Sequence, residues 1–127
     1  MHILGIGTEI VECLRIGRMI ERHGELFLTR VYTAREIRSC QRRKHVTELF
    51  AERWAAKKAI LKSLGLNAPR GRAWTDVEVR DLPEGKTKIY LCGLARERCV
   101  DLRVSDVLLS VAHCRAYATA TAIAVRP

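Results

Sequence analysis

One helical segment constrains this chain more than any other feature. It runs from Leu49 to Leu64 with no proline or glycine inside it, and Gly65 follows directly. Thr47 has a side chain suited to cap the start of such a helix, and a glycine after the last turn is a common helix stop. We therefore expect a helix from about Thr47 to Leu64, with the core of the protein against its apolar face.

The apolar face of this segment also carries basic side chains. At about 100° per residue, its large apolar residues lie within an arc of roughly 140°; they are Leu49, Phe50, Trp54, Ile60, Leu61 and Leu64. Arg53 and Lys57 lie in the same arc, where a cation has a large desolvation penalty unless an anion meets it. Lys58 and Lys62, on the flank of the arc, can converge on one anion. Together the four cations predict a site for a polyphosphate.

A less specific interpretation of these cations remains open. Arg53 and Lys57 can also extend past the edge of the core to water, or pair with carboxylates inside the protein. Lys58 and Lys62, taken alone, are typical of an ordinary solvent-exposed helix surface. The pattern by itself does not separate the two interpretations.

The segments on either side of this helix show strand and helix patterns in turn. Thr33 and Glu36 have the spacing of a capping box, which predicts a helix from Thr33 to about Arg43 or Lys44. The other predicted helices span residues 12–23 and 94–101, and the predicted strands span 3–11, 74–80, 87–92, 104–112 and 117–125, with a turn at 83–86. This order predicts one α+β domain over residues 1–127, with mostly antiparallel pairing.

Composition limits the class of protein. The 127 residues are 48% hydrophobic, which suits a single modest core, and no apolar run approaches the roughly 20 residues of a membrane span. The five cysteines are widely spaced and include no CxxC pair, so they indicate neither a zinc site nor a disulfide framework. We expect a soluble protein of the reducing cytoplasm that does not bind membranes.

The charge of the chain predicts an anionic partner. Twenty-three Lys and Arg residues against fourteen Asp and Glu leave a net charge of +9, which attracts nucleic acid, a phosphate-rich small molecule or an acidic protein. The basic run Arg42-Arg43-Lys44 would suit a nucleic acid backbone. Aromatic residues make up only 6% of the chain, however, and no base-stacking motif is present. A nucleic-acid-binding domain is therefore the less favoured alternative.

Four motifs spread over most of the chain are similar to those of one enzyme family. The first is Gly5-Ile6-Gly7-Thr8-Glu9-Ile10-Val11-Glu12 followed by Arg15, and the second is Phe50-Ala51-x-Arg53-Trp54-Ala55-Ala56-Lys57-x-Ala59-x-x-Lys62-x-x-Gly65. The third is Trp74-Thr75-Asp76-Val77-Glu78-Val79, and the fourth is Leu109-Ser110-Val111-Ala112-His113 with Tyr117, Ala118 and Ala120. In this order the motifs resemble those of holo-[acyl-carrier-protein] synthases, the short, single-domain type of 4′-phosphopantetheinyl transferase.

The resemblance implies the fold of these transferases, with a mostly antiparallel sheet packed on a long central helix, and it implies a reaction. The 4′-phosphopantetheine of coenzyme A moves to a serine of apo acyl carrier protein, adenosine 3′,5′-bisphosphate is released, and magnesium assists. The positions that match the metal-binding carboxylates of the family hold Glu9 and Lys58. Glu9 is therefore the expected metal ligand, whereas a protonated Lys58 cannot ligate magnesium and brings a cation in place of a carboxylate.

Two hypotheses follow from Lys58. In the first, its ammonium partly replaces the metal on the pyrophosphate, and Glu9 is its ion-pair partner or a general base for the serine hydroxyl. In the second, the chain is a catalytically impaired paralogue that binds coenzyme A or a carrier protein without transferring anything.

The resemblance also implies roles for the remaining site residues. The expected catalytic residues are Glu9, Lys58 and Lys62, and the expected contacts with coenzyme A are Arg53, Lys57, Lys62, Gly65 and His113. His113 is equally typical of an ordinary histidine at a strand end. The first helix is expected to dock the acidic carrier protein through Arg15, Met19 and Arg22. The implied assembly is a homotrimer with active sites between subunits.

Overall fold

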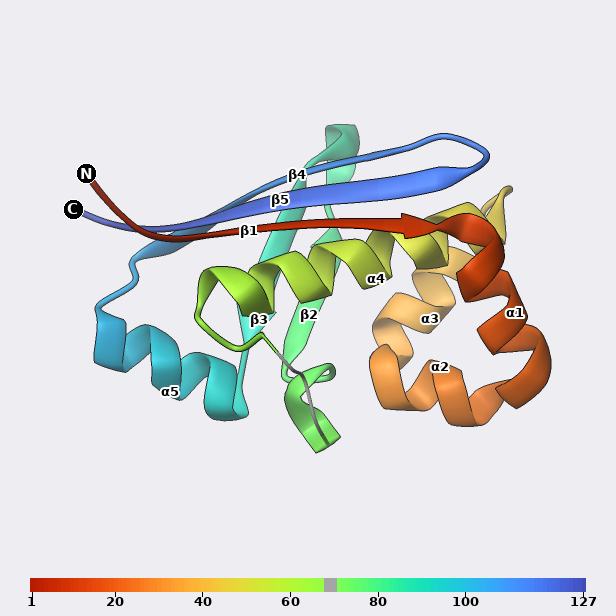
Figure 1. Ribbon diagram of the computed structural model, residues 1–127, viewed down its shortest axis with the longest axis horizontal. Helices are drawn as coiled ribbons and strands as arrows, with labels where there is room; N and C mark the ends of the chain where they lie inside the picture. Colours follow the sequence, from red (N-terminus) through yellow and green to blue (C-terminus); the bar gives the residue numbers. More distant parts are fainter. Residues whose placement is uncertain (68–70) are drawn as a thin grey trace.

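The computed structural model describes residues 1–67 and 71–127, which form two antiparallel sheets and several helices around one long helix (Figure 1). The larger sheet has the strand order β1-β5-β4, built from β1 (His2–Glu12), β4 (Asp106–His113) and β5 (Tyr117–Arg126). Helix α4 (Val46–Ser63) runs beneath this sheet along the direction of its strands (Figure 1). The predicted α+β class, the antiparallel pairing and the long central helix are confirmed.

Small residues separate the larger sheet from α4. Every second residue of β5 from Ala118 to Ala124 is an alanine that is at most 1% exposed. On β1 the contact is with the helix backbone itself. A Cβ atom on Gly5 would lie 2.0 Å from the carbonyl oxygen of Ser63, and one on Gly7 would lie 2.0 Å from that of Ala59. Only glycine fits at these two positions, so β1 and α4 lie in backbone contact.

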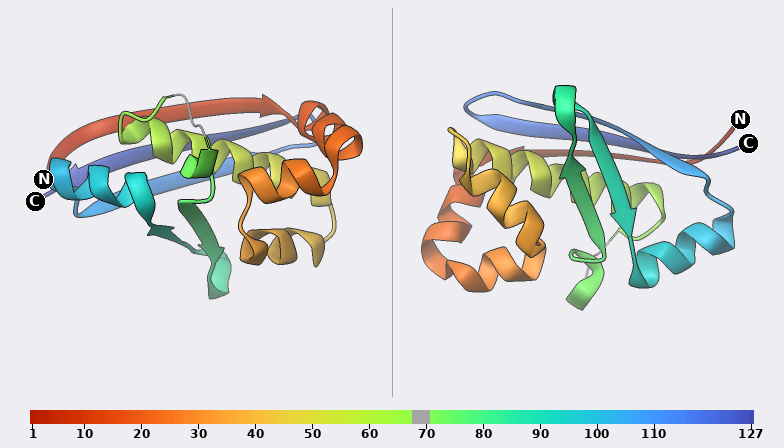
Figure 2. Two further views of the ribbon diagram at one scale, coloured as in Figure 1. Left: turned by 90° about the horizontal axis from the view of Figure 1, so that it is seen from below. Right: turned by 180° about the vertical axis from the view of Figure 1, so that it is seen from behind.

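The second sheet is a two-stranded hairpin that is separate from the larger sheet, and its strands cross α4 (Figure 2). Strands β2 (Val77–Asp81) and β3 (Thr87–Leu91) pair across the short helical turn η2 (Pro83–Gly85), as predicted. Strand β2 begins three residues later than expected, because residues 74–76 form a turn that places Trp74 against Trp54 of α4, with ring centroids 5.5 Å apart. The turn η1 (Gly71–Ala73) precedes the hairpin, and α5 (Gly93–Leu102) joins β3 to β4.

Three helices enclose the N-terminal end of α4: α1 (Cys13–His23), α2 (Glu25–Val31) and α3 (Ala34–Gln41) (Figure 1). The sequence patterns do not predict α2, which follows a sharp turn at Gly24 with φ of 50° and buries Phe27 and Val31. The Tyr32 hydroxyl then donates to the carbonyl oxygen of Phe50 at 2.7 Å and ties this end to α4. No helix within the described ranges is long and apolar enough to cross a membrane.

Two predicted helix boundaries need correction. Helix α4 begins at Val46 rather than after a Thr47 cap, because His45 adopts the left-handed conformation with φ of 59° and takes the N-cap position. The capping box of α3 is confirmed: the Thr33 hydroxyl accepts from the Glu36 N–H, and the Glu36 carboxylate accepts from the Thr33 N–H. The helix nevertheless ends at Gln41, before the predicted end, because the next four residues form the turn into α4.

Candidate functional site

Glu9 lies at the centre of a cluster of charges between β1 and α4. Its Oε1 is 2.5 Å from Nζ of Lys62, and its Oε2 is 3.9 Å from Nζ of Lys58. The Lys62 ammonium also donates a hydrogen bond to the carbonyl oxygen of Thr8, at 3.2 Å. The structure thus brings together, within one chain, the three side chains that the sequence predicted to be catalytic.

The local fold explains why these side chains meet. Alternation along β1 turns Glu9 toward α4 on the same side as Gly7 and Val11. The backbone contact at Gly7 holds the strand close to the helix. Lys58 and Lys62 are one helical turn apart, so both reach the same side of α4. A nearly buried carboxylate requires a neutralising partner, and the two ammoniums provide it.

The cluster has an excess of positive charge within reach of solvent. Glu9 is only 9% exposed, whereas the side chains of Lys58 and Lys62 are 29% and 36% exposed. One carboxylate cannot neutralise two ammoniums, so a net positive charge remains available to a dissolved anion. A phosphate or pyrophosphate group suits this arrangement, because lysine ammoniums act as point charges with several hydrogen-bond donors.

The donors around Glu9 do not fit a magnesium ion as they stand. Magnesium takes octahedral oxygen ligands, usually including one or two protein carboxylates. Here an ammonium faces each oxygen of a single carboxylate. Oε1 is buried and accepts no hydrogen bond of normal geometry from the described residues, so charge rather than a directional bond holds Lys62. Within residues 1–67 and 71–127, no group of three or more His, Cys, Asp or Glu side chains is placed to hold a metal.

Lys57 lies in the core of the single chain, away from the surface position that its predicted contact with coenzyme A implied. Lys57 and Glu36 are both fully buried, with Nζ 2.5 Å from Oε1. The other Glu36 oxygen accepts the backbone N–H of Val79 on β2, at 3.0 Å. Burial lowers the pKa of Lys57, while the neighbouring Glu36 charge opposes that shift. This ion pair joins α3, α4 and β2 in the core.

Arg53 also forms an ion pair with a carboxylate inside the protein. Its Nη2 donates to both oxygens of Asp81, at 3.0 and 2.9 Å, and its Nη1 donates to the carbonyl oxygen of Val79. Burial would raise the pKa of Asp81, but the hydrogen bond from Ser39 and the charge of Arg53 outweigh it and lower that pKa. The prediction of one cradle of four cations therefore needs correction: internal carboxylates partner Arg53 and Lys57, whereas the side chains of Lys58 and Lys62 are partly exposed.

The other two predicted contacts with coenzyme A lie outside the Glu9 cluster. Gly65 follows the end of α4, is exposed, and has φ of 79°, a conformation that favours glycine. His113 ends β4, and its Nδ1 pairs with Oε2 of Glu52 near the start of α4. Residues 52 and 65 are 13 positions apart, which is roughly 20 Å along a helix. Within one chain, His113 and Gly65 therefore flank the cluster from opposite ends of α4.

Trp54 lies beside the cluster, although the sequence patterns gave it no role beyond its place on the apolar face and in the second motif. The Nζ of Lys58 lies 4.9 Å from the centroid of the Trp54 ring. The signal in the sequence is the spacing of four residues between them, because such residues are neighbours on a helix surface. Only the structure shows that the Trp54 ring also touches Trp74.

The predicted docking residues lie together on the first helix. Arg15, Met19 and Arg22 are all exposed, and Met19 is 36% exposed. Their spacing of four and then three residues places them on one face of α1.

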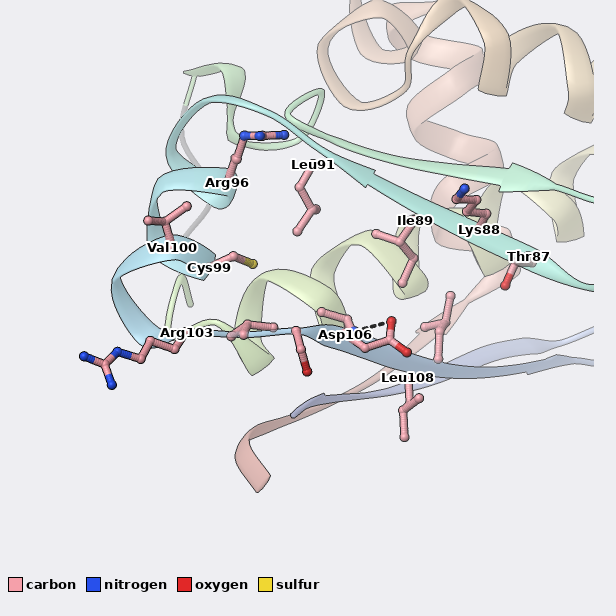
Figure 3. Close-up of a pocket in the computed structure, with 14 residues that line it drawn as sticks. Thr87, Lys88, Ile89, Leu91, Arg96, Cys99, Val100, Arg103, Asp106 and Leu108 are labelled. Atoms are coloured by element: carbon pink, nitrogen blue, oxygen red, sulfur yellow. Dashed lines mark hydrogen bonds between the residues drawn. The ribbon is translucent and has the colours of Figure 1, made fainter. Parts of the chain in front are cut away.

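The structure also contains a separate hollow (Figure 3). It has a volume of about 720 Å³ and lies between β3, α5 and β4, where Ile89, Leu91 and Cys99 line it. None of the predicted site residues lines this hollow. The hollow is therefore separate from the residues that the motifs single out.

Comparison with known proteins places the chain among transferases. The family model of the 4′-phosphopantetheinyl transferase superfamily matches residues 5–122. This range contains the Glu9 cluster together with α4 and the hairpin. The holo-[acyl-carrier-protein] synthase of Rhodopirellula baltica is 43% identical over 120 residues, which cover 94% of this chain and 95% of that protein.

Solved structures agree with this result. The holo-[acyl-carrier-protein] synthase of Neisseria meningitidis matches with a TM-score of 0.86 and 28% identity, over 98% of this chain and 100% of that one. The synthase of Bacillus anthracis, solved in complex with coenzyme A (3′,5′-ADP), matches with a TM-score of 0.75 and 28% identity, over 96% of each chain.

Proposed function

This chain belongs to the 4′-phosphopantetheinyl transferase superfamily, and from that premise we propose that the Glu9 cluster is the phosphate-binding centre of a holo-[acyl-carrier-protein] synthase. The protein transfers the 4′-phosphopantetheine of coenzyme A to a serine of apo acyl carrier protein and releases adenosine 3′,5′-bisphosphate. One observation supports the choice of this centre above others: two partly exposed ammoniums meet one nearly buried carboxylate where β1 touches α4.

The reaction requires positive charge around a pyrophosphate. The serine oxygen forms a bond to the phosphorus that carries pantetheine, and the bond from that phosphorus to the bridging oxygen breaks. The electron pair of the broken bond stays on the bridging oxygen, which leaves with adenosine 3′,5′-bisphosphate, and the serine proton passes to a base or to solvent. Negative charge develops on these phosphate oxygens, and the ammoniums of Lys58 and Lys62 are suited to stabilise it.

Within this proposal, Glu9 is the ion-pair partner that holds both ammoniums, because each of its oxygens already faces one of them. Lys58 supplies positive charge at the position where the resemblance implies a metal-binding carboxylate. We therefore expect transfer that tolerates the removal of magnesium. A catalytically impaired paralogue is the second candidate, and the observation that favours it is the lysine at position 58, where the resemblance implies a metal-binding carboxylate.

The deciding experiment is intact-mass analysis of an apo acyl carrier protein incubated with coenzyme A and this protein, with magnesium or with chelator. The proposal expects the mass of phosphopantetheine to be added in both samples. Lys58→Glu, which places a carboxylate beside Glu9, is expected to increase turnover with magnesium and to lose it with chelator, while Lys44→Glu on an exposed turn changes neither. Transfer by the wild type only with magnesium contradicts the ammonium hypothesis, and no transfer to any of several carriers supports the binding paralogue.

We also propose that α1 docks the carrier protein through Arg15, Met19 and Arg22, because carrier proteins of this kind are acidic and the two arginines are exposed. The double substitution Arg15→Glu and Arg22→Glu is expected to raise the KM for the carrier about tenfold or more and to leave the KM for coenzyme A unchanged. Arg96→Glu on α5, exposed at the other end of the molecule, is the control. Equal carrier KM values for the two variants would contradict the docking assignment.

The outer face of the larger sheet supports the trimer that the resemblance implies. Three rows of side chains cross the three strands on the side away from α4: Ile6, Ile123 and Leu108; Thr8, Thr121 and Ser110; and Ile10, Thr119 and Ala112. None of these nine residues is charged, and Ile6 and Ile10 are 59% and 63% exposed in the single chain. A sheet face of this kind is typical of a surface that another protein chain covers.

We propose that this face joins three chains, with active sites between subunits as the resemblance implies. Light scattering after size exclusion is expected to give three times the chain mass of 14.4 kDa. Ile6→Glu is expected to yield smaller species, because it places a charge in the middle of the interface. Asp101→Lys, an exposed change on α5, serves as control. A monomeric wild type at micromolar concentration would refute the assembly.

A further inference from the structure

We propose that Trp54 is a positioning residue for Lys58. The Trp54 ring holds the Lys58 ammonium beside Glu9, so that the N–H donors of that ammonium are directed to the pyrophosphate of coenzyme A. The inference rests on the proposed function of the Glu9 cluster, and it deepens that function by explaining how a lysine works at the position of a carboxylate. Three contacts support it: Lys58 with the Trp54 ring, Lys58 with Glu9, and the Trp54 ring with the Trp74 ring.

The two ammoniums of the cluster are held in different ways. Lys62 is 2.5 Å from Glu9 and donates a hydrogen bond to the carbonyl oxygen of Thr8. Lys58 lies 3.9 Å from Glu9, which is too long for a hydrogen bond. Its second anchor is the Trp54 ring, whose centroid is 4.9 Å from Nζ and within the range of a cation–π interaction.

This difference leaves the hydrogen-bond donors of Lys58 available. A protonated lysine has three N–H donors, and the face of an aromatic ring attracts the charge without accepting a conventional hydrogen bond. The contact with Trp54 and the 3.9 Å separation from Glu9 therefore fix the place of the ammonium without using its donors. Phosphate oxygens can then accept hydrogen bonds from all three N–H donors of Lys58. Lys62 cannot offer all of its donors in this way, because one already bonds the carbonyl oxygen of Thr8 and its ammonium is only 2.5 Å from Glu9.

Trp54 is itself held in place, which makes it suitable as an anchor. Its ring packs on Trp74 with centroids 5.5 Å apart and an angle of 31° between the planes. Trp54 precedes Lys58 by one helical turn, so the lysine chain crosses the ring on the surface of α4. A lysine side chain loses considerable conformational freedom when a ligand orders it. Contact with the ring restricts the conformations of the Lys58 side chain before coenzyme A binds. Less conformational entropy is then lost on binding, so coenzyme A binds more tightly.

A double-mutant cycle tests the inference with coenzyme A as the probe. Trp54→Leu is expected to raise the Kd for coenzyme A, measured by calorimetry, by about 3- to 20-fold. In the Lys58→Met background the same substitution is expected to have no effect, because the ammonium is gone. Trp54→Phe keeps an aromatic face and is expected to retain most of the affinity. An equal loss from Trp54→Leu in both backgrounds would show that Trp54 is only structural and would overturn the proposal.

A measurement on the protein without ligand separates this inference from the proposed function. The ring current of Trp54 is expected to shift the methylene proton resonances of Lys58 in the NMR spectrum, and Trp54→Leu is expected to remove the shift while circular dichroism shows an unchanged fold. An unshifted Lys58 in the wild type overturns the positioning role. If coenzyme A binds none of the variants, nor the wild type, the proposed function fails, while the NMR result still decides the contact.

Discussion

Replacing Lys57 with methionine is expected to lower the free energy of unfolding by about 3–5 kcal/mol, because removal of one partner leaves the other charge buried alone. The side chain of Glu36 is 0% exposed, and Lys57 is its cationic partner at 2.5 Å. A natural domain has only about 5–15 kcal/mol of stability, so the variant is expected to be close to unfolding. Urea denaturation followed by circular dichroism measures the change.

Two further variants make this prediction specific to the buried pair. Lys44→Met removes a lysine from an exposed turn and is expected to change the stability by no more than about 0.5 kcal/mol. Adding Glu36→Gln to Lys57→Met is expected to recover part of the loss, because glutamine removes the unpaired charge, although its single acceptor oxygen can serve only one of the Thr33 and Val79 N–H groups. A loss below about 1 kcal/mol in Lys57→Met would show that Glu36 does not depend on this cation.

Substituting Glu9 with glutamine is expected to reduce kcat/KM for coenzyme A by about 100-fold or more, the loss typical when preorganised charge is removed from a reaction centre. The amide has nearly the same size, but it has no charge to hold the ammoniums of Lys58 and Lys62. Without that anion the two cations repel each other and move apart. Intact-mass analysis of the carrier at several coenzyme A concentrations provides the measurement.

The control for this variant is Glu97→Gln, which removes the same charge from an exposed position on α5. It is expected to leave kcat/KM within about twofold of the wild type. Circular dichroism of Glu9→Gln must show the wild-type fold for the comparison to hold. If the folded variant retains more than about a third of the wild-type kcat/KM, Glu9 is not the organiser of the centre.

The parts of the fold that local patterns encode could be predicted from the sequence. The capping box at Thr33, the hairpin and the two long C-terminal strands depend on residues close to each other in the chain, and the structure confirms them. Helix α2 could not be predicted in the same way. It has seven residues, and its stability comes from burying Phe27 and Val31, so it depends on tertiary contacts.

The same distinction applies to the site. Helical spacing showed that Arg53 and Lys57 need anions, but it could not identify them, because Asp81 and Glu36 are 28 and 21 positions away in the chain. Glu36 is also a capping residue, and this local role gives no sign of its second role in the core. The contact of Trp54 with Trp74 likewise depends on a turn that follows the helix at a distance.

The buried alanines of β5 have a consequence for the electrostatics of the centre. Their methyl groups set the distance between the sheet and α4, and β1 is hydrogen-bonded to β5 along its length. The separation between Glu9 and the lysines of α4 therefore depends on side chains that carry no charge and face no substrate. Because the energy between two charges varies inversely with their distance, a change of volume at Ala120 or Ala122 tunes the strength of this ion pair while leaving every charged residue in place.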